Sequence, residues 1–236
     1  MLGVVRLRFK RPFAWWLLIS LTVAGFVGLC KLSWWQWQRA QEKSLLLHQV
    51  ALNQQQPLSI NDIQWQQLTS LNGAALTGQV QWLSPYSWLL DNQLVDGRPG
   101  YDVVIPVRSG TDQLLLVNLG WVAAPMSRDE LPTLQIPTQF ALDGILRVEP
   151  SGVLLGQNIE VGEYPQRAQQ LRVADFNAQS GLMLPNAVFY QRTSPWLFHY
   201  QPSVMPPEKH QAYALQWAGL ACVWLVGGML LSKRPV

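Results

Sequence analysis

The residues best placed to do chemistry open the last apolar run of the chain. His210, Tyr213 and Trp217 are spaced by three and four residues, so a helix would carry them on one face. A neutral imidazole is a standard axial ligand of heme iron, and the aromatic rings below it could accept a flat macrocycle. The alternative is an interfacial histidine above an aromatic belt, which needs no cofactor, and the residues alone favour this plainer interpretation.

A second polar set follows the first apolar run. Gln36, Arg39 and Lys43 have helical spacing and therefore share one face of a helix. Such a face could hold a heme propionate, or a loop of a partner protein, through charge-assisted hydrogen bonds. The alternative is contact with lipid headgroups by snorkelling, which the residues alone favour slightly.

Other chemistries find little support in the sequence. It contains no G-x-S-x-G nucleophile turn and no Walker loop, so we expect no catalytic residues and no enzyme activity. Three histidines, with no cysteine between the apolar runs, argue against a zinc site and leave His210 as the one candidate metal ligand. Cys30 and Cys222 should differ in depth by roughly 16 Å, too far for a disulfide, so we expect two free thiols.

Two uncharged apolar segments predict helices that cross a membrane. The first, residues 13–30, would rise about 27 Å as a helix, close to the hydrocarbon thickness of a bilayer. The second is residues 211–232. A cleaved signal peptide would be shorter in its apolar part and would end in small residues, which the first segment lacks.

The distribution of charge predicts the orientation of these helices. Of the 236 residues, 49% are hydrophobic and 13% charged, and the net charge is +3. Residues 31–209 hold 11 bases and all 14 acids, or about −3, and the ends hold six bases and no acid. The positive-inside rule therefore places both termini in the cytoplasm, and bases that flank a membrane argue against nucleic-acid binding. The six are Arg6, Arg8, Lys10, Arg11, Lys233 and Arg234.

The predicted order of segments follows from these spans. A cytoplasmic basic tail (1–12) precedes the first transmembrane helix (13–33), and a periplasmic domain (34–209) precedes the second (210–232) and a short tail (233–236). No Arg-rich and Ser-rich transit peptide is present, which favours a bacterial inner membrane over a mitochondrial one. The first helix should continue out of the membrane through residues 34–50, which lack proline and glycine.

Beyond residue 75 the sequence predicts a mainly antiparallel β domain, barrel-like or sandwich-like, with a few short helices. Short apolar runs alternate with turn signals such as Asp96-Gly97, Pro99-Gly100 and Ser109-Gly110. Residues 173–180 are predicted to form a short helix. The predicted strands are 79–83, 87–90, 101–105, 114–117, 141–146 and 186–191.

Four motifs, in this order, resemble those of the Surfeit locus protein 1 family. LSWWQWQR at 32–39, followed by Lys43, is similar to L-G-x-W-Q-x-x-R…K, and LVNLGWV at 116–122 is similar to L-V-N-R-G-W-V. Between them, residues 92–106 carry the asparagine, glycines, tyrosine and proline of N-R…G…G-Y…P, and 210–217 matches the H-x-x-Y-A-x-Q-W that opens the second span. The chain departs from the family pattern at Ser33, Gln93, Leu119 and Lys209.

The resemblance covers nearly the whole chain and implies a cytochrome c oxidase assembly factor without enzyme activity. It implies that the chain handles heme a, bound transiently at His210, or facilitates its insertion into the catalytic subunit of the oxidase. That subunit, heme a synthase and the lipid bilayer are the implied partners, and nucleic acid is not. The alternative is a cofactor-free structural envelope protein whose periplasmic domain recruits partners. The cofactor-binding residues would be His210, Tyr213, Trp217, Gln36, Arg39 and Lys43.

Overall fold

A computed structural model describes residues 13–148, 156–201 and 205–233 of the chain. The chain divides into a helical unit, Met1–Leu46 with Ser203–Val236, and a β-rich unit, Leu47–Pro202. Most of the terminal basic residues, on which the predicted orientation rests, lie outside the described residues.

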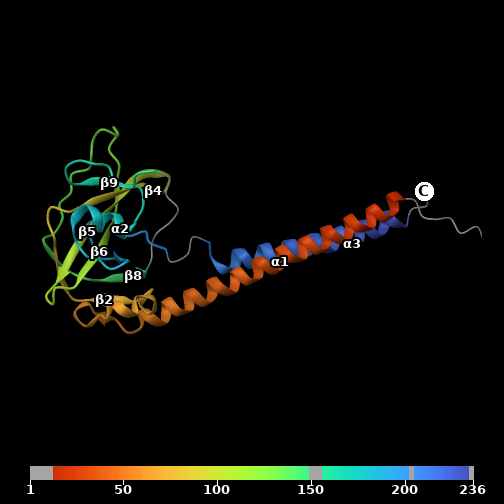
Figure 1. Cartoon of the computed structure of the whole chain (residues 1–236), viewed down its shortest axis with the longest axis horizontal. Coiled ribbons are helices and arrows are strands. Elements are labelled where there is room, and N and C mark those ends of the chain that lie inside the picture. The colour runs from red at the N-terminus through yellow and green to blue at the C-terminus, as the bar shows by residue number, and fades with distance from the viewer. Residues whose placement is uncertain (1–12, 149–155, 202–204, 234–236) are drawn as a thin grey trace, which may run out of the picture. The chain divides into compact units, whose positions relative to one another are not determined.

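The helical unit contains α3 and the part of α1 up to Leu46, and these two long helices lie side by side (Figure 1). α1 spans Phe13–Gln54 without interruption, so the predicted continuation beyond residue 34 is confirmed. α3 spans Pro207–Ser232 and starts with a proline, whose missing N–H is tolerated in the first turn. Both helices are long and apolar enough to cross a membrane.

Small residues let α1 and α3 approach closely. The indole of Trp224 covers Gly25 so tightly that a Cβ there would collide with the ring, and its Nε1 donates to the carbonyl of Thr22 over 3.0 Å. Gly228 packs against the Thr22 side chain in the same way. Contacts of this kind hold helices together inside a membrane, where apolar burial supplies little driving force.

The β-rich unit is built on one curled sheet, which has ten strands among the described residues. The strand order is β1-β2-β8-β10-β6-β5-β3-β7, and β4 joins β5 to β9. Short helices η1 (Ile60–Asp62), η2 (Trp65–Leu71) and α2 (Val173–Ser180) accompany the sheet, and α2 has the predicted bounds. The strands are β1 (Leu58–Ser59), β2 (Ala75–Thr77), β3 (Gln79–Trp82), β4 (Trp88–Val95), β5 (Arg98–Ser109), β6 (Leu114–Ala123), β7 (Gln139–Ala141), β8 (Gly144–Val148), β9 (Gln166–Ala168) and β10 (Ala187–Gln191).

The pairing is mostly antiparallel, as predicted, but three pairs are parallel: β1 with β2, β6 with β10, and β4 with β9. The prediction of one strand over residues 141–146 is wrong, because this segment contains the end of β7 and the start of β8. The chain changes partners at Leu142 and Asp143, so that β7 pairs with β3 and β8 pairs with β2 and β10. The predicted turn at Pro99-Gly100 is also wrong, because both residues lie inside β5. Gly100 is needed there because the ring of Trp121 leaves no room for a Cβ.

Two apolar cores explain why the central strands are apolar on both faces. Val103, Val117 and Phe189 pack in one core, while their neighbours Val104 and Val188 pack in the other. The second core is covered by α2, whose fully buried Phe176 ring lies 4.6 Å from that of Trp88. A sheet buried on both faces reads in sequence as continuous apolar runs rather than as an alternating pattern.

Candidate functional site

His210 lies in the first turn of α3 and contacts Gln36 of α1. The Nδ1 atom of His210 is 2.8 Å from the Oε1 atom of Gln36. A carboxamide oxygen can only accept a hydrogen bond, so in a neutral His210 ring Nδ1 carries the proton and Nε2 keeps its lone pair. Histidines that bind metals are oriented in this way, with one ring nitrogen donating to an acceptor and the other free to coordinate. Both residues were predicted site residues, but their contact was not predicted.

The aromatic residues predicted below His210 follow it on α3. Tyr213 is 43% exposed and Trp217 is half-buried. Ala214, one turn after His210, is buried, and its carbonyl accepts a hydrogen bond of 2.8 Å from the Ser33 hydroxyl of α1. The Gln36–His210 and Ser33–Ala214 contacts together fix the register of the two helices at this end.

The predicted basic face on α1 is partly neutralised by an acid. The Nη1 atom of Arg39 lies 2.8 Å from the Oε2 atom of Glu42, with both side chains about half exposed, and the guanidinium lies 5.8 Å from the centre of the Trp35 ring. An exposed ion pair at this spacing is weak and exchanges partners readily. Lys43, one turn beyond Arg39, is half-buried. The sequence interpretation overlooked Glu42, although it lies beside Lys43 in the sequence.

An apolar hollow, here named the seam groove, runs between α1 and α3 from the level of Ser33 and Ala214. It has a volume of about 470 Å³. Both cysteines line it, as free thiols, which confirms the prediction of two unpaired cysteines. At 1.5 Å per residue, Cys30 and Cys222 lie about 9 and 18 Å from the Gln36–His210 pair. Their depths therefore differ by roughly 9 Å rather than the predicted 16 Å, because His210 lies level with Gln36 and not with Cys30.

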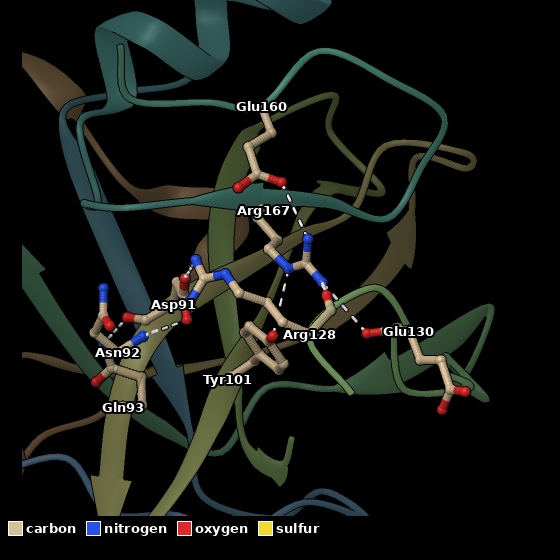
Figure 2. Close-up of polar contacts among 8 residues, drawn as sticks. All are labelled: Asp91, Asn92, Gln93, Tyr101, Arg128, Glu130, Glu160 and Arg167. Atoms are coloured by element: carbon tan, nitrogen blue, oxygen red, sulfur yellow. Dashed lines mark hydrogen bonds and ion pairs between the residues drawn. The ribbon is translucent and has the colours of Figure 1, made fainter. Parts of the chain in front are cut away.

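The β-rich unit carries a polar cluster that sequence reasoning did not single out (Figure 2). Arg128 forms an ion pair of 2.7 Å with the mostly buried Asp91. Arg167 forms one of 3.2 Å with Glu160 and also donates to the hydroxyl of Tyr101 and to the carbonyl of Arg128. Asp91, Tyr101 and Arg128 help to line a hollow of about 290 Å³. This hollow belongs to the β-rich unit, and none of the predicted site residues lines it.

Asp102, Asn118 and the partly buried His199 form a hydrogen-bonded trio in the same unit, which the sequence interpretation did not predict. Asp102, which is 3% exposed, has its Oδ1 atom 2.6 Å from Nε2 of His199 and accepts a hydrogen bond of 2.7 Å on Oδ2 from Asn118. The hydrogen bond that His199 donates to the Asp102 carboxylate raises the pKa of His199 above its usual value, against the opposing effect of burial. An aspartate inside the apolar run at 101–105 was the signal that could have revealed this trio.

The second and third sequence motifs meet at the β5–β6 pair. Trp121 packs on Gly100, and its Nε1 donates to the Gln93 carbonyl over 3.2 Å. Gln93 donates in turn to the Asp91 carbonyl over 2.9 Å. Leu119 is 1% exposed in the core, so this position presents no polar group in this chain. The motif residues described here serve the packing of the sheet.

Two helices long and apolar enough to cross a membrane, joined by a β-rich unit, indicate a membrane protein of the anchored-domain class. The sequence matches the model of the SURF1 family over residues 23–222, which includes all four motifs. The chain therefore belongs to the SURF1 family, whose members are associated with cytochrome c oxidase assembly and are assembly factors rather than a known family of enzymes. No individually curated protein matches the sequence.

Proposed function

We propose that this chain assists cytochrome c oxidase assembly by holding heme a at His210 and delivering it to the catalytic subunit. The family places the chain in oxidase assembly, and heme a is a membrane-confined cargo of that process. The contact between Gln36 and His210 is the observation that carries the proposal, because it keeps Nε2 of His210 available to iron.

The other predicted site residues have complementary parts in this proposal. Tyr213 and Trp217 offer flat apolar surface to the macrocycle, and Arg39 and Lys43 offer positive charge to its propionates. Arg39 can exchange Glu42 for a propionate at little cost, because the pair is exposed. A single histidine ligand suits a carrier, since a cargo held too firmly would not be released to the oxidase.

The location in the cell forms part of the same proposal. Both helices cross the inner membrane of a bacterium, with the termini in the cytoplasm and the β-rich unit in the periplasm. The proposed membrane segments are 13–33 and 210–232, which leaves His210 at the outer interface. Heme a would arrive there from heme a synthase without exposing its apolar tail to water.

The test is an absorption spectrum of the full chain purified in detergent from cells that also make heme a synthase. The proposal predicts a Soret band and heme a in the extracted pigment. A preparation without heme a, from cells whose oxidase contains it normally, contradicts the proposal. Cells without heme a synthase provide the matched control, because their preparation should lack the pigment.

A second candidate function, recruitment of partner proteins without any cofactor, is favoured by one observation. The hollow at Arg128 is bordered by Leu94 and Met126, which are 69% and 106% exposed. Exposed apolar side chains around an arginine are typical of protein contact surfaces. If this function is the main one, Arg128→Ala should reduce copurification of the oxidase catalytic subunit, and His210→Ala should not.

A further inference from the structure

We infer that the seam groove binds the isoprenoid tail of heme a and thereby makes the chain selective for hemes that carry such a tail. This inference rests on the proposed function and extends it. His210 alone would coordinate any heme, so the choice among hemes must come from another part of the molecule.

The seam groove begins close to His210, where the tail of a heme bound to this histidine would start. Its first α3 residue, Ala214, lies one turn from His210. On α1, the groove is lined by Ser33, three residues before Gln36, and by Trp37, which follows Gln36 directly. Along α3 the groove continues to Cys222, which is eight residues or about 12 Å beyond Ala214. A tail attached to a macrocycle at His210 can therefore enter the groove without leaving the helix pair.

The lining of the groove suits a hydrocarbon chain. Phe26, Ala218 and Ala221 present apolar surface, and the two free thiols behave as small hydrophobic groups. The hydroxyl of Ser33 is already used by its hydrogen bond to the carbonyl of Ala214. A volume of about 470 Å³ lies within the range of pockets that bind small molecules, roughly 300–1,000 Å³.

A second hollow on the helical unit provides a natural control. It has a volume of about 480 Å³ and is lined by Gly25, Gly28, Leu29, Leu32 and Trp224. Its residue on α3, Trp224, is 14 residues or about 21 Å from His210. The lining of this hollow is equally apolar, but the hollow does not begin beside His210.

The experiment compares heme o with heme b, because they share a macrocycle and differ in that only heme o carries the tail. Each is titrated by absorbance into the full chain in detergent. The parent protein should bind heme o at least about tenfold more tightly, since burying two CH₂ groups already supplies that factor. Ala218→Phe fills the groove and should reduce heme o affinity to that of heme b while leaving heme b binding unchanged.

Gly28→Phe is the matched control variant. A Cβ at Gly28 has nothing within 4 Å, and Gly28 lines the second hollow, so we expect the new side chain to occupy that hollow. This variant should keep the full preference for heme o. The cysteines give a second readout: heme o should slow alkylation of Cys222 by an apolar maleimide, and heme b should not.

The outcomes separate this inference from the proposed function. The inference that the tail binds in the seam groove is overturned if the parent binds both hemes with equal affinity, or if the preference for heme o survives Ala218→Phe. Either result leaves the proposed heme site at His210 intact. Loss of the preference in Gly28→Phe as well as in Ala218→Phe also overturns it. Failure of the parent to bind either heme overturns the proposed function and this inference together.

Discussion

His199 is held against the buried carboxylate of Asp102, with 2.6 Å between Nε2 and Oδ1. The carboxylate is 4% exposed and the imidazole 28% exposed. Two residues earlier, Leu197 forms a β-bridge with Trp121 of β6. The pair therefore fixes the last described segment of the β-rich unit to β5, while the bridge fixes it to β6.

This pair predicts a pH-dependent stability. Because the folded pKa of His199 lies above its unfolded value of 6.5, the stabilisation is complete below that value and is lost as the pH rises through the raised pKa. We expect the free energy of unfolding of the β-rich unit to fall by about 1–2 kcal/mol between about pH 6 and pH 9. Chemical denaturation of the full chain in detergent, followed by tryptophan fluorescence, measures this change.

His199→Gln should remove the pH dependence while keeping a hydrogen-bond donor beside Asp102. The tyrosines on the neighbouring elements do not interfere in this window, because burial raises the pKa of Tyr200 and raises that of Tyr190 to about 12. An unchanged pH profile in His199→Gln would show that another group is responsible.

Gly100 should be sensitive to the addition of one methyl group. A Cβ at this position collides with the indole of Trp121 and with the carbonyl of Val122, so Gly100→Ala should destabilise the β-rich unit by about 1–3 kcal/mol. Gly110→Ala is the matched control, because a Cβ there meets nothing within 4 Å, and its stability should be close to that of the parent. Equal denaturation midpoints for the two variants would contradict the packing of Trp121 on Gly100.

Gln36 should control how well His210 binds heme a. Gln36→Leu removes the acceptor for Nδ1 and should weaken heme a retention about tenfold, as is usual for the loss of a residue that orients a ligand. Gln36→Glu keeps an acceptor and should retain heme a nearly as well as the parent. Equal retention by all three proteins would mean that the contact does not orient His210.

The proposed topology predicts that both termini are cytoplasmic. A reporter enzyme that is active only in the periplasm, fused after Val236, should be silent. The same reporter inserted at Gly110 of the β-rich unit, where the chain is open to solvent, should be active. Activity of the terminal fusion would refute the orientation deduced from the terminal basic residues.

Local sequence patterns predicted most elements, because apolar runs and turn residues carry their own signal. Residues 34–54 and 173–180 are helical where the sequence lacks proline and glycine, and Asp96-Gly97 turns β4 into β5. Parallel pairs such as β6 with β10 join strands distant in the chain and leave no turn to recognise.

For a similar reason, the sequence predicted which candidate site residues share a helix face but not which of them touch across the two helices. Helical spacing grouped His210 with its neighbours on α3 and Gln36 with its neighbours on α1. The contact between the two sets depends on the register of α1 against α3, which no local pattern encodes. The seam groove and the Asp102–His199 pair likewise depend on packing between distant segments.

The most direct measurement is the ratio of heme a to protein in His210→Ala, purified in detergent from cells that also make heme a synthase. The proposal predicts that the variant inserts normally but loses the Soret band of the parent. His48→Ala, at the exposed histidine of α1, is the matched control and should retain the band. If His210→Ala copurifies with as much heme a as the parent, with an unchanged spectrum, then His210 is an interfacial residue and the site lies elsewhere.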